Sequence, residues 1–553
     1  LMLQKRSLII NKLKTYISEQ IVHTLNRFDL PLNEFSLSPP KKDDFGDLST
    51  NVAMILARAM KKPPLEIAKN IQKDLLENGL DNIKDVTVTP PGFINFIVHP
   101  SFYQNKIKSI IKDGENFGKD NIGKGKSANV EFVSANPTGP LTIGHGRNAV
   151  LGDTVSNILE WHGYQVTREY YYNDAGKQMR MLGKSVASRY FELLNKASDF
   201  PEEGYQGEYI IDIAKRVLDK FGKELDEGDE RFLTEAESEI FQQIESSLKT
   251  LGISFDKFSN EKTYYESGAI KDLLEELKEK NLIYDKDGAT WYKATATGGQ
   301  QDKVYIKSTG EPTYRLPDTA YHKDKINRGF DLIVDVFGAD HADTYPDVLS
   351  ALNALGLNTD HIKVLLYQFV TLIRDGKKVK MSTRKADFVT LDDLIDELGI
   401  DIVRYFFIMR SMNSHLDFDL DLAKDQSDNN PVFYLQYAYA RICNIIKHGD
   451  EKGSTLIDTF DQKLLNEENE LRLMKLMSNF PVVMHNALDT LEPQNIVNYL
   501  QGLATQFHKF YGTCKVITDS KELTQSRLGL ILSTKIILST GLSILGIGAP
   551  ERM

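Results

Sequence analysis

The spacing of hydrophobic residues between positions 127 and 172 predicts a strand, then a helix, then a second strand. Residues 129–134 form a short, mostly apolar run, apolar side chains recur at helical spacing across 150–159, and 166–172 form the next run. This β-α-β order predicts a parallel, doubly wound sheet. Similar runs at 332–337 and 364–367 are expected to resume the same sheet.

The pattern on either side of this unit predicts further domains. Residues 1–118 indicate a small α+β domain, with two short apolar runs around Pro90-Pro91-Gly92 and a glycine-rich linker at its end. We assign 119–375 to the sheet domain, with an acidic, mainly helical insertion at about 183–300. Residues 376–429 form a connecting region, and 430–553 predict an all-α bundle with few helix breakers.

Composition narrows the class of protein. A chain of 553 residues with 41% hydrophobic and 26% charged residues is typical of a folded multidomain protein. Only Cys443 and Cys514 occur, so a disulfide framework and a four-cysteine zinc site are excluded and a cytoplasmic location is expected. Residues 528–547 are long enough to span a membrane, but Lys535 in their middle favours a buried bundle helix, and no membrane partner is expected.

Candidate chemistry begins in the loop after residue 134. In an open α/β sheet the carboxyl end of a strand leads into a helix N-terminus that can bind phosphate. The run Gly144-His145-Gly146-Arg147 offers close backbone approach and two side chains able to donate to phosphate oxygens. A dinucleotide motif would need glycine at Ala149, and a Walker phosphate loop is missing from the sequence.

A second basic element follows a predicted Asp-Gly hairpin at residues 373–377. Residues 377–385 hold five cations together with Ser382 and Thr383, which suits a clamp on a triphosphate. A solvated basic loop is the simpler interpretation and would be preferred if this element stood alone.

The two elements together resemble the paired signatures of class I aminoacyl-tRNA synthetases. Residues 140–145 (PLTIGH) resemble their His-Ile-Gly-His motif, and 380–384 (KMSTR) resemble their Lys-Met-Ser-Lys loop. Thr142 departs from the pattern, since it stands where the family usually has histidine. The runs ANPTGP at 135–140, GADH at 338–341 and APERM at 549–553 are similar to the arginyl-tRNA synthetases of bacterial type.

That resemblance implies an arginine–tRNA ligase, which activates L-arginine with ATP and transfers it to tRNA(Arg), with activation dependent on bound tRNA. The implied catalytic residues are Thr142, Gly144, His145, Lys380 and Ser382. The implied ATP-binding residues are Pro140, Gly144, His145, Gly338, Asp340, His341, Lys380 and Met381. The implied tRNA-binding residues, which are equally typical of a bundle core, are Tyr434, Tyr437 and Arg441.

Arginine binding calls for fixed acceptors that match a planar guanidinium. The resemblance places arginine at Glu131, Ser134, Asn136, His145, Tyr314 and Asp318. Two alternatives stay open: Glu131 as an edge-strand carboxylate that faces water, and Asp318 as a helix cap.

The same resemblance implies Mg²⁺ bound with ATP, no zinc, no tightly bound cofactor and a monomer. The alternatives are another class I synthetase, such as a cysteine enzyme with zinc-binding cysteines, and an inactive relative that only binds tRNA.

Overall fold

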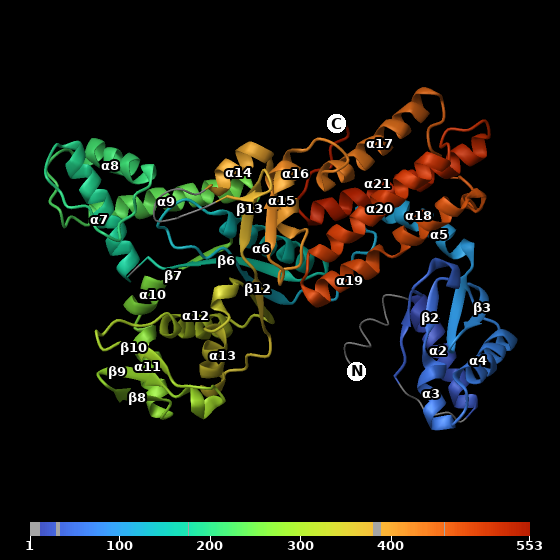
Figure 1. Ribbon diagram of the computed structural model, residues 1–553, viewed down its shortest axis with the longest axis horizontal. Coiled ribbons are helices and arrows are strands. Elements are labelled where there is room, and N and C mark those ends of the chain that lie inside the picture. Colours follow the sequence, from blue (N-terminus) through green and yellow to red (C-terminus); the bar gives the residue numbers. More distant parts are fainter. Residues whose placement is uncertain (1–11, 29–33, 175, 380–388, 458) are drawn as a thin grey trace.

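The computed structural model describes residues 12–28, 34–174, 176–379, 389–457 and 459–553. Figure 1 shows a central sheet with a small N-terminal domain and a C-terminal helical bundle toward one end, and helices of the insertion at the other. The predicted fold class is confirmed: a multidomain α/β protein with a parallel sheet, an α+β N-terminal domain and an all-α bundle.

The central sheet has the strand order β12-β11-β5-β6-β7, and every neighbouring pair is parallel. The chain starts in the middle and builds outward to both sides, so the topological switch point lies between β5 and β11. The loops that follow these two strands therefore face the crevice in which open α/β sheets bind ligands. The strands are β5 (Ser127–Glu131), β6 (Gln165–Tyr172), β7 (Lys257–Asn260), β11 (Leu332–Gly338) and β12 (Ile362–Tyr367).

Helix α6 (Ile143–Trp161) connects β5 to β6 and packs directly on the sheet. Most of its residues are buried, so it is a core helix rather than an amphipathic surface helix. Gly152 allows the close approach, because a Cβ atom there would lie 2.3 Å from the Cβ of Phe132. The N-terminal turn of α6 is thereby held at the switch point.

The segment predicted as a mainly helical insertion has helices along its whole length, and its second half also contains strands. Its helices α7, α8 and α9 pack on one another, whereas its second half contributes β7 to the central sheet and a separate sheet of order β10-β9-β8. The elements are α7 (Gly176–Leu193), α8 (Glu208–Phe221), α9 (Arg231–Thr250), α10 (Glu261–Glu266), α11 (Ala269–Glu279), β8 (Ile283–Lys286), β9 (Ala289–Tyr292), η3 (Ala294–Thr297) and β10 (Lys303–Ile306).

The remaining elements of the sheet domain and of the region after it lie between residues 315 and 424. A sheet of order β14-β13-β15 includes the predicted hairpin, in which Asp375 and Gly376 both have positive φ, as a two-residue turn requires. The elements are α12 (Arg315–Asn327), η4 (Ala339–His341), α13 (Tyr345–Ala354), β13 (Val370–Arg374), β14 (Lys377–Lys378), α14 (Leu391–Leu398), α15 (Ile400–Ile408), β15 (Leu416–Asp419) and α16 (Leu420–Lys424).

The N-terminal domain has its own hydrophobic core and a sheet of order β1-β2-β4-β3. The predicted helix at 51–60 and the two strands around Pro90 are present. Its elements are α2 (Lys12–Arg27), β1 (Leu37–Ser38), η1 (Asp43–Phe45), β2 (Leu48–Thr50), α3 (Val52–Met60), α4 (Pro64–Asn78), β3 (Ile83–Thr89) and β4 (Phe93–Val98).

The next helix, α5 (Pro100–Asp113), packs on the C-terminal bundle. Gln104 fixes this contact by donating to the backbone oxygen of Leu465 at 3.0 Å. The expected unit 1–118 therefore contains a helix that belongs, by its packing, to the bundle. The bundle elements are α17 (Pro431–Glu451), η6 (Gln462–Leu464), α18 (Glu468–Ser478), α19 (Phe480–Thr490), α20 (Gln494–Thr513) and α21 (Lys521–Ile544), with η2 (Gly114–Asn116) beside α21.

Helix α21 is long and apolar enough to cross a membrane by length and composition, and 72% of its most apolar window is buried inside the protein. It packs against α5, α17 and α20. Lys535 lies at its partly exposed side, 3.4 Å from Glu551. These contacts agree with the expected bundle helix.

We expect Gly152→Ala to lower stability by about 1–3 kcal/mol, because the added methyl group overlaps the Phe132 side chain and forces α6 away from β5. The midpoint of denaturant-induced unfolding would measure the loss. The matched control is Gly502→Ala in α20, where no atom lies within 4 Å of the added Cβ, and which should stabilise by up to about 1 kcal/mol. Equal midpoints for the two variants would contradict the packing argument.

Candidate active site

The loop after β5 turns sharply to reach α6. Val133 and Ser134 have φ angles of 65° and 44°, which are uncommon for two consecutive non-glycine residues and are found at functional turns. The turn brings the Ser134 hydroxyl back toward its own strand, where it donates to Glu131 Oε1 at 3.0 Å. Two predicted arginine-binding residues are thus held together.

Thr142 is the N-cap of α6. Its hydroxyl accepts from the backbone N–H of His145 at 3.4 Å, and its own N–H donates to His145 Nδ1 at 3.2 Å, so the two residues form a reciprocal capping box. The threonine that replaces the usual histidine therefore performs a defined structural task. The remaining N–H groups of this turn, around the half-exposed Gly144, lie at the positive end of the helix dipole.

The capping box also fixes the chemistry of His145. Because Nδ1 accepts a hydrogen bond, the ring proton lies on Nε2, which is the donor available to a ligand. Burial lowers the pKa of His145 to about 4. The ring is therefore neutral at pH 7 and donates a hydrogen bond without carrying a positive charge.

Arg147 does not have the phosphate-facing position suggested by its place in the motif. Its side chain is fully buried, and its guanidinium donates to the backbone oxygens of Gln368, Ser411 and Ser414 at 2.5, 3.1 and 3.2 Å. A guanidinium directed into the protein cannot reach a ligand at the helix N-terminus. The expectation of a second phosphate donor in this run was wrong.

Glu131 lies at the end of the central strand, so the alternative of an edge-strand carboxylate facing water is wrong. The ammonium of Lys325 from α12 lies 2.5 Å from Glu131 Oε2 and 2.5 Å from Asp335 Oδ1. His322, one helical turn before Lys325, contacts the other oxygen of Asp335 at 3.2 Å. Burial would lower the pKa of Lys325, but Asp335 and Glu131 raise it above its usual value, so the cluster stays ionised.

Asp318 lies in the first turn of α12 but not at its N-cap position. The N-cap of α12 is Tyr314, so the helix-cap alternative for Asp318 is wrong. Its carboxylate helps to line a small cavity together with His322, Phe337 and His341. Burial and, to a smaller extent, the charge of Glu131 raise the pKa of Asp318 to about 6. The cavity thus joins a predicted arginine-binding residue to a predicted ATP-binding residue.

Glu261 is a candidate that the sequence did not single out. It is the first residue of α10, and its Oε2 accepts from Tyr171 at 3.1 Å and Asn173 at 2.8 Å. Burial and the nearby charge of Asp318 help to raise its pKa to about 7. No local motif marks Glu261, because its neighbours in the site come from β6 and α12. The spacing of His322 and Lys325 on one helical face was the only sequence signal for the buried cluster beside it.

The other predicted arginine-binding residues differ in their surroundings. Asn136 donates to Gln178 Oε1 and accepts from the N–H of Asn173, both at 2.9 Å, so its amide orientation is fixed. Tyr314 is 65% exposed and projects from the start of α12. The structure thus brings Glu131, Ser134 and Asp318 toward one site and leaves Tyr314 at the surface.

The predicted adenosine-contacting turn follows β11, next to the turn of α6 across the switch point. A Cβ atom at Gly338 would lie 2.3 Å from Asp340 Oδ1, so a larger residue would displace the Asp340 side chain from its observed position. The ring of His341 stacks on Phe337 with centroids 5.1 Å apart. Asp340 and His341 are exposed, and Pro140 on the opposite loop is half-exposed. These groups can contact a nucleotide held between the two loops.

Lys380, Met381 and Ser382 lie outside the described residues. The chain that follows them is described from Val389 onward and is attached to the α6 turn. Thr390 forms an antiparallel bridge with Thr142, and the N–H of Leu391 donates to the oxygen of Leu141 at 2.8 Å. This bridge holds the chain at Thr390 and Leu391 beside the first signature.

Tyr434, Tyr437 and Arg441 occupy one side of α17. The Arg441 guanidinium lies 4.3 Å from the ring centroid of Tyr437 and 5.1 Å from that of Tyr511. The ring of His508 stacks near Tyr437 at 6.1 Å. Because Tyr437 is exposed, the core interpretation does not hold for it. The side chains form a partly exposed platform of aromatic rings and one guanidinium.

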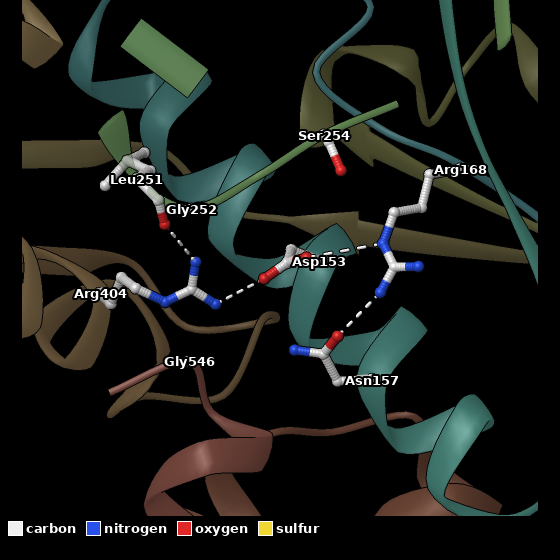
Figure 2. Close-up of a pocket in the computed structure, with 8 residues that line it drawn as sticks. All are labelled: Asp153, Asn157, Arg168, Leu251, Gly252, Ser254, Arg404 and Gly546. Carbon is white, nitrogen blue, oxygen red and sulfur yellow. Dashed lines mark hydrogen bonds and ion pairs between the residues drawn. The ribbon is translucent and has the colours of Figure 1, made fainter. Parts of the chain in front are cut away.

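A polar pocket of about 390 Å³ lies beside the middle of α6, roughly 15 Å along the helix from its first turn (Figure 2). Arg404 on its wall donates to Asp153 Oδ2 at 2.6 Å and to the backbone oxygen of Leu251 at 2.9 Å. Arg168 contacts Asp153 at 3.6 Å and donates to Asn157 at 2.8 Å. The charged groups of this pocket hold α6, α9 and α15 together.

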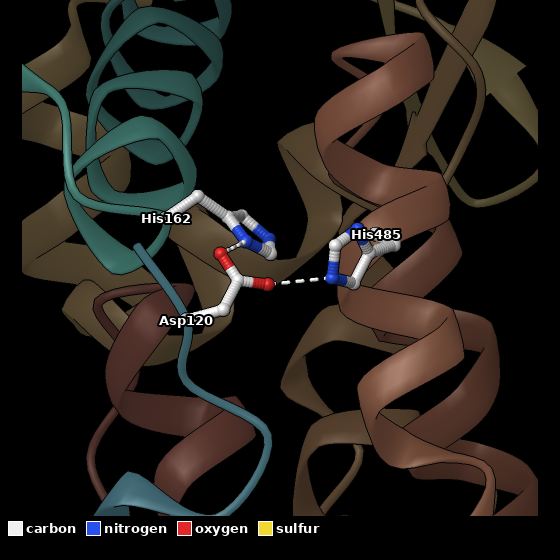
Figure 3. Close-up of side chains that lie close together, drawn as sticks. All are labelled: Asp120, His162 and His485. Atoms are coloured by element: carbon white, nitrogen blue, oxygen red, sulfur yellow. Dashed lines mark hydrogen bonds and ion pairs between the residues drawn. The ribbon is translucent and has the colours of Figure 1, made fainter. Parts of the chain in front are cut away.

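Figure 3 shows Asp120 from the linker between two histidines, His162 at the end of α6 and His485 on α19. His162 Nδ1 lies 2.9 Å from Asp120 Oδ1 and its Nε2 lies 3.0 Å from the oxygen of Met484. His485 Nε2 lies 2.5 Å from Asp120 Oδ2. Burial alone would raise the pKa of Asp120, but the two histidines lower it well below its usual value. The group joins the far end of α6 to the bundle.

Comparison with protein families shows which class this architecture belongs to. Residues 106–405 match the catalytic domain of class I (R) tRNA synthetases, and 435–553 match the DALR anticodon binding domain. Residues 11–98 match the N-terminal domain of arginyl-tRNA synthetases. The parallel sheet, the capped turn at its switch point and these matches define a class I aminoacyl-tRNA synthetase.

Individual relatives show which amino acid's synthetases this chain belongs with. The chain is 47% identical to an arginine–tRNA ligase of Desulfotalea psychrophila, covering 95% of this chain and 96% of the relative, and 46% identical to that of Salinibacter ruber, covering 98% and 100%. The chain belongs to the arginyl-tRNA synthetase family.

Solved structures of arginyl-tRNA synthetases have the same fold as this chain. A putative arginyl-tRNA synthetase from Campylobacter jejuni has a TM-score of 0.75 at 33% identity, covering 82% of this chain and 100% of that one. The arginyl-tRNA synthetase of Thermus thermophilus has the same TM-score at 20% identity, covering 97% and 99%, and shows the shared fold.

The protonation state of His145 can be tested directly. We expect the ring to be neutral at pH 6 and to titrate near pH 4, because burial lowers its pKa from 6.5. The stability contributed by the neutral ring should then be lost as pH falls from 6.5 toward 4. NMR of the protein with ¹³C-labelled histidine would follow the titration, with His145→Gln to assign the signal. A midpoint near 6.5 would show that the ring is solvated.

Proposed function

We propose that the protein works as an arginine–tRNA ligase through the first turn of α6 and the acidic site beside it. It activates L-arginine with ATP to arginyl-adenylate, releasing pyrophosphate, and transfers the arginyl group to tRNA(Arg), releasing AMP. The observation that carries the proposal is the juxtaposition of a phosphate-binding helix N-terminus, with a neutral His145, and the carboxylates of Glu131, Asp318 and Glu261.

The acidic site suits a guanidinium better than an ammonium. Burial raises the pKa of both Asp318 and Glu261, and the charge of Asp318 adds to the rise at Glu261, so a bound cation stabilises both ionised carboxylates. A planar guanidinium carries five donors in a fixed arrangement and can pair with several carboxylates at once. Glu131 ends β5, and Ser134 and Asn136 lie between β5 and α6, so these three residues are assigned to the amino acid's backbone end.

ATP is assigned to the crevice between the loops after β5 and β11. The N–H groups near Gly144 and the Nε2–H of His145 donate to the α-phosphate as the arginine carboxylate attacks it, where negative charge accumulates. Gly338, Asp340 and His341 contact the adenosine, and Pro140 closes the opposite side. Lys380, Met381 and Ser382 complete the phosphate site in this proposal, and Mg²⁺ enters as part of the ATP substrate, bound mostly by phosphate and water.

The bundle is assigned to the anticodon and the N-terminal domain to the outer corner of the tRNA. The platform of Tyr434, Tyr437 and Arg441 supports this, because aromatic and guanidinium planes stack on unpaired bases. A monomer in the cytoplasm completes the proposal. The cytoplasmic location is supported by Cys443 and Cys514, which are both free thiols.

Purified protein should arginylate tRNA(Arg) in the presence of ATP and Mg²⁺. We expect His145→Ala to lower kcat by about 100-fold or more, because it removes the donor at the α-phosphate. Thr142→His should leave the fold intact and change only the activation rate. Small and equal effects of both variants would show that the site is misplaced.

Tight tRNA binding without arginylation would instead support an inactive relative that only binds tRNA. Full activity of Lys380→Ala would show that this lysine is not a clamp on the triphosphate.

Arginine recognition should depend on pH through Asp318. Its pKa is raised to about 6, so the carboxylate is ionised at pH 7.5 and largely protonated at pH 5. The KM for arginine should therefore rise about tenfold between pH 7.5 and pH 5, since the guanidinium stays charged throughout.

The isosteric control is Asp318→Asn, measured over the same pH range. It should have a high KM at all pH values. Any remaining dependence should come from Glu261 and lie below pH 7, because the variant removes the Asp318 charge that helps to raise the pKa of Glu261. An unchanged pH profile in this variant would remove Asp318 from the arginine site.

A further inference from the structure

The buried guanidinium of Arg147 rests on a loop that also touches the C-terminal bundle. Arg147 lies two residues after His145, and its hydrogen-bond partners among the described residues are backbone oxygens. Two of these, Ser411 and Ser414, belong to the loop after α15. The third, Gln368, is attached to that loop, because its N–H donates to the oxygen of Met412 at 2.9 Å.

The other side of the same loop is held by Glu492, which lies between α19 and α20 of the bundle. Glu492 Oε1 accepts from the Ser411 hydroxyl at 3.0 Å, and Oε2 accepts from the Met412 N–H at 3.4 Å. Both oxygens of a bundle carboxylate are therefore directed at the loop that receives Arg147.

A single peptide group lies between the two charges. The oxygen that accepts from Arg147 Nη2 and the N–H that donates to Glu492 both belong to the peptide bond between Ser411 and Met412. In a trans peptide the C=O and N–H point in opposite directions. The negative oxygen end of this peptide dipole therefore faces Arg147, and the positive N–H end faces Glu492. Burial lowers the pKa of Arg147 to about 10, while the charges of Tyr367 and Glu492 oppose that shift.

The position of Arg147 affects the candidate active site because other side chains pack tightly around the first turn of α6. A Cβ atom at Gly146 would lie 2.6 Å from Leu391 and 3.0 Å from Phe407, so this part of the turn has no room to move independently. A shift of Arg147 would therefore move the turn as a unit, including His145 and the N–H groups that bind phosphate. Displacements of about 1 Å at such groups can cost about two orders of magnitude in rate.

We propose that Glu492 is a positioning residue for the activation reaction. It acts from the bundle, through the Ser411–Met412 peptide and Arg147, on the turn that carries His145. The inference rests on the proposed function of that turn. It also gives the tRNA-binding bundle a direct structural connection to the site of ATP chemistry.

The test compares Glu492→Gln with the wild-type protein. Glutamine keeps the size of the side chain but removes the charge and replaces one of the two acceptor oxygens with an NH2 donor. We expect kcat for arginine-dependent ATP–pyrophosphate exchange, at saturating arginine and tRNA(Arg), to fall about tenfold. The Tm should stay within about 2 °C, and the Kd for tRNA within about twofold. Hydrogen–deuterium exchange should become faster in the backbone of residues 142–150.

The matched control is Glu468→Gln in the same bundle, whose exposed carboxylate pairs with Arg472 one helical turn away. It should leave rate and exchange unchanged. Ser411→Ala removes one of the two bonds to Glu492 and should have a smaller effect than Glu492→Gln. In a double variant with Arg147→Lys, the combined loss should be smaller than the product of the single losses, because both changes act on one peptide.

Three other outcomes would contradict the proposal or the function on which it rests, and each can be told apart from the others. A lower Tm or weaker tRNA binding with unchanged kcat would make Glu492 a bundle or tRNA residue. Unchanged exchange at 142–150 in Glu492→Gln would show that the loop does not hold the turn. If the wild-type protein shows no exchange of pyrophosphate, the proposed function is wrong, and the hydrogen–deuterium comparison still decides whether Glu492 positions α6.

Discussion

The position of one helix end decides what this protein can do. The first turn of α6 presents backbone N–H groups that have no partner within the helix, at the switch point of the central sheet. Thr142 and His145 satisfy part of this turn by capping each other, which leaves the Nε2–H of His145 and the N–H groups near Gly144 for a ligand. The rest of the structure can be understood as the set of contacts that hold this helix end in place.

Those contacts come from every part of the chain that packs on α6. Gly152 brings the helix against Phe132 of the central sheet, and Asp153 is held by Arg404. The far end is joined to the bundle through His162 and Asp120. A helix fixed along its whole length transmits a displacement at one contact to the others, because packed cores resist gradual deformation. This explains why polar groups remote from the ligand crevice are buried and paired.

The carboxylates near the carboxyl ends of the strands fall into two groups, according to whether a cation of the protein neutralises them. Glu131 and Asp335 are compensated within the protein by Lys325, whereas Asp318 and Glu261 have raised pKa values. Buried carboxylates that lack an internal cation are costly, and the cost falls when a cationic ligand binds. The protein therefore separates carboxylates that are paired within the fold from carboxylates whose ionised form is disfavoured by burial.

The sequence alone determined the local features of this protein. The period of apolar residues predicted β5, α6, β6, β11 and β12, and the Asp375-Gly376 pair predicted the hairpin, because these patterns depend on neighbours in the chain. The motif around His145 and its resemblance to the class I synthetases located the helix N-terminus. Only the tertiary structure decided which side chains face the crevice. Arg147 lies in the motif yet turns inward, and Glu261 lies far from it yet joins the site. The physical reason is that side-chain direction and pKa depend on burial and on charges brought together from distant segments, and neither quantity is encoded in local spacing.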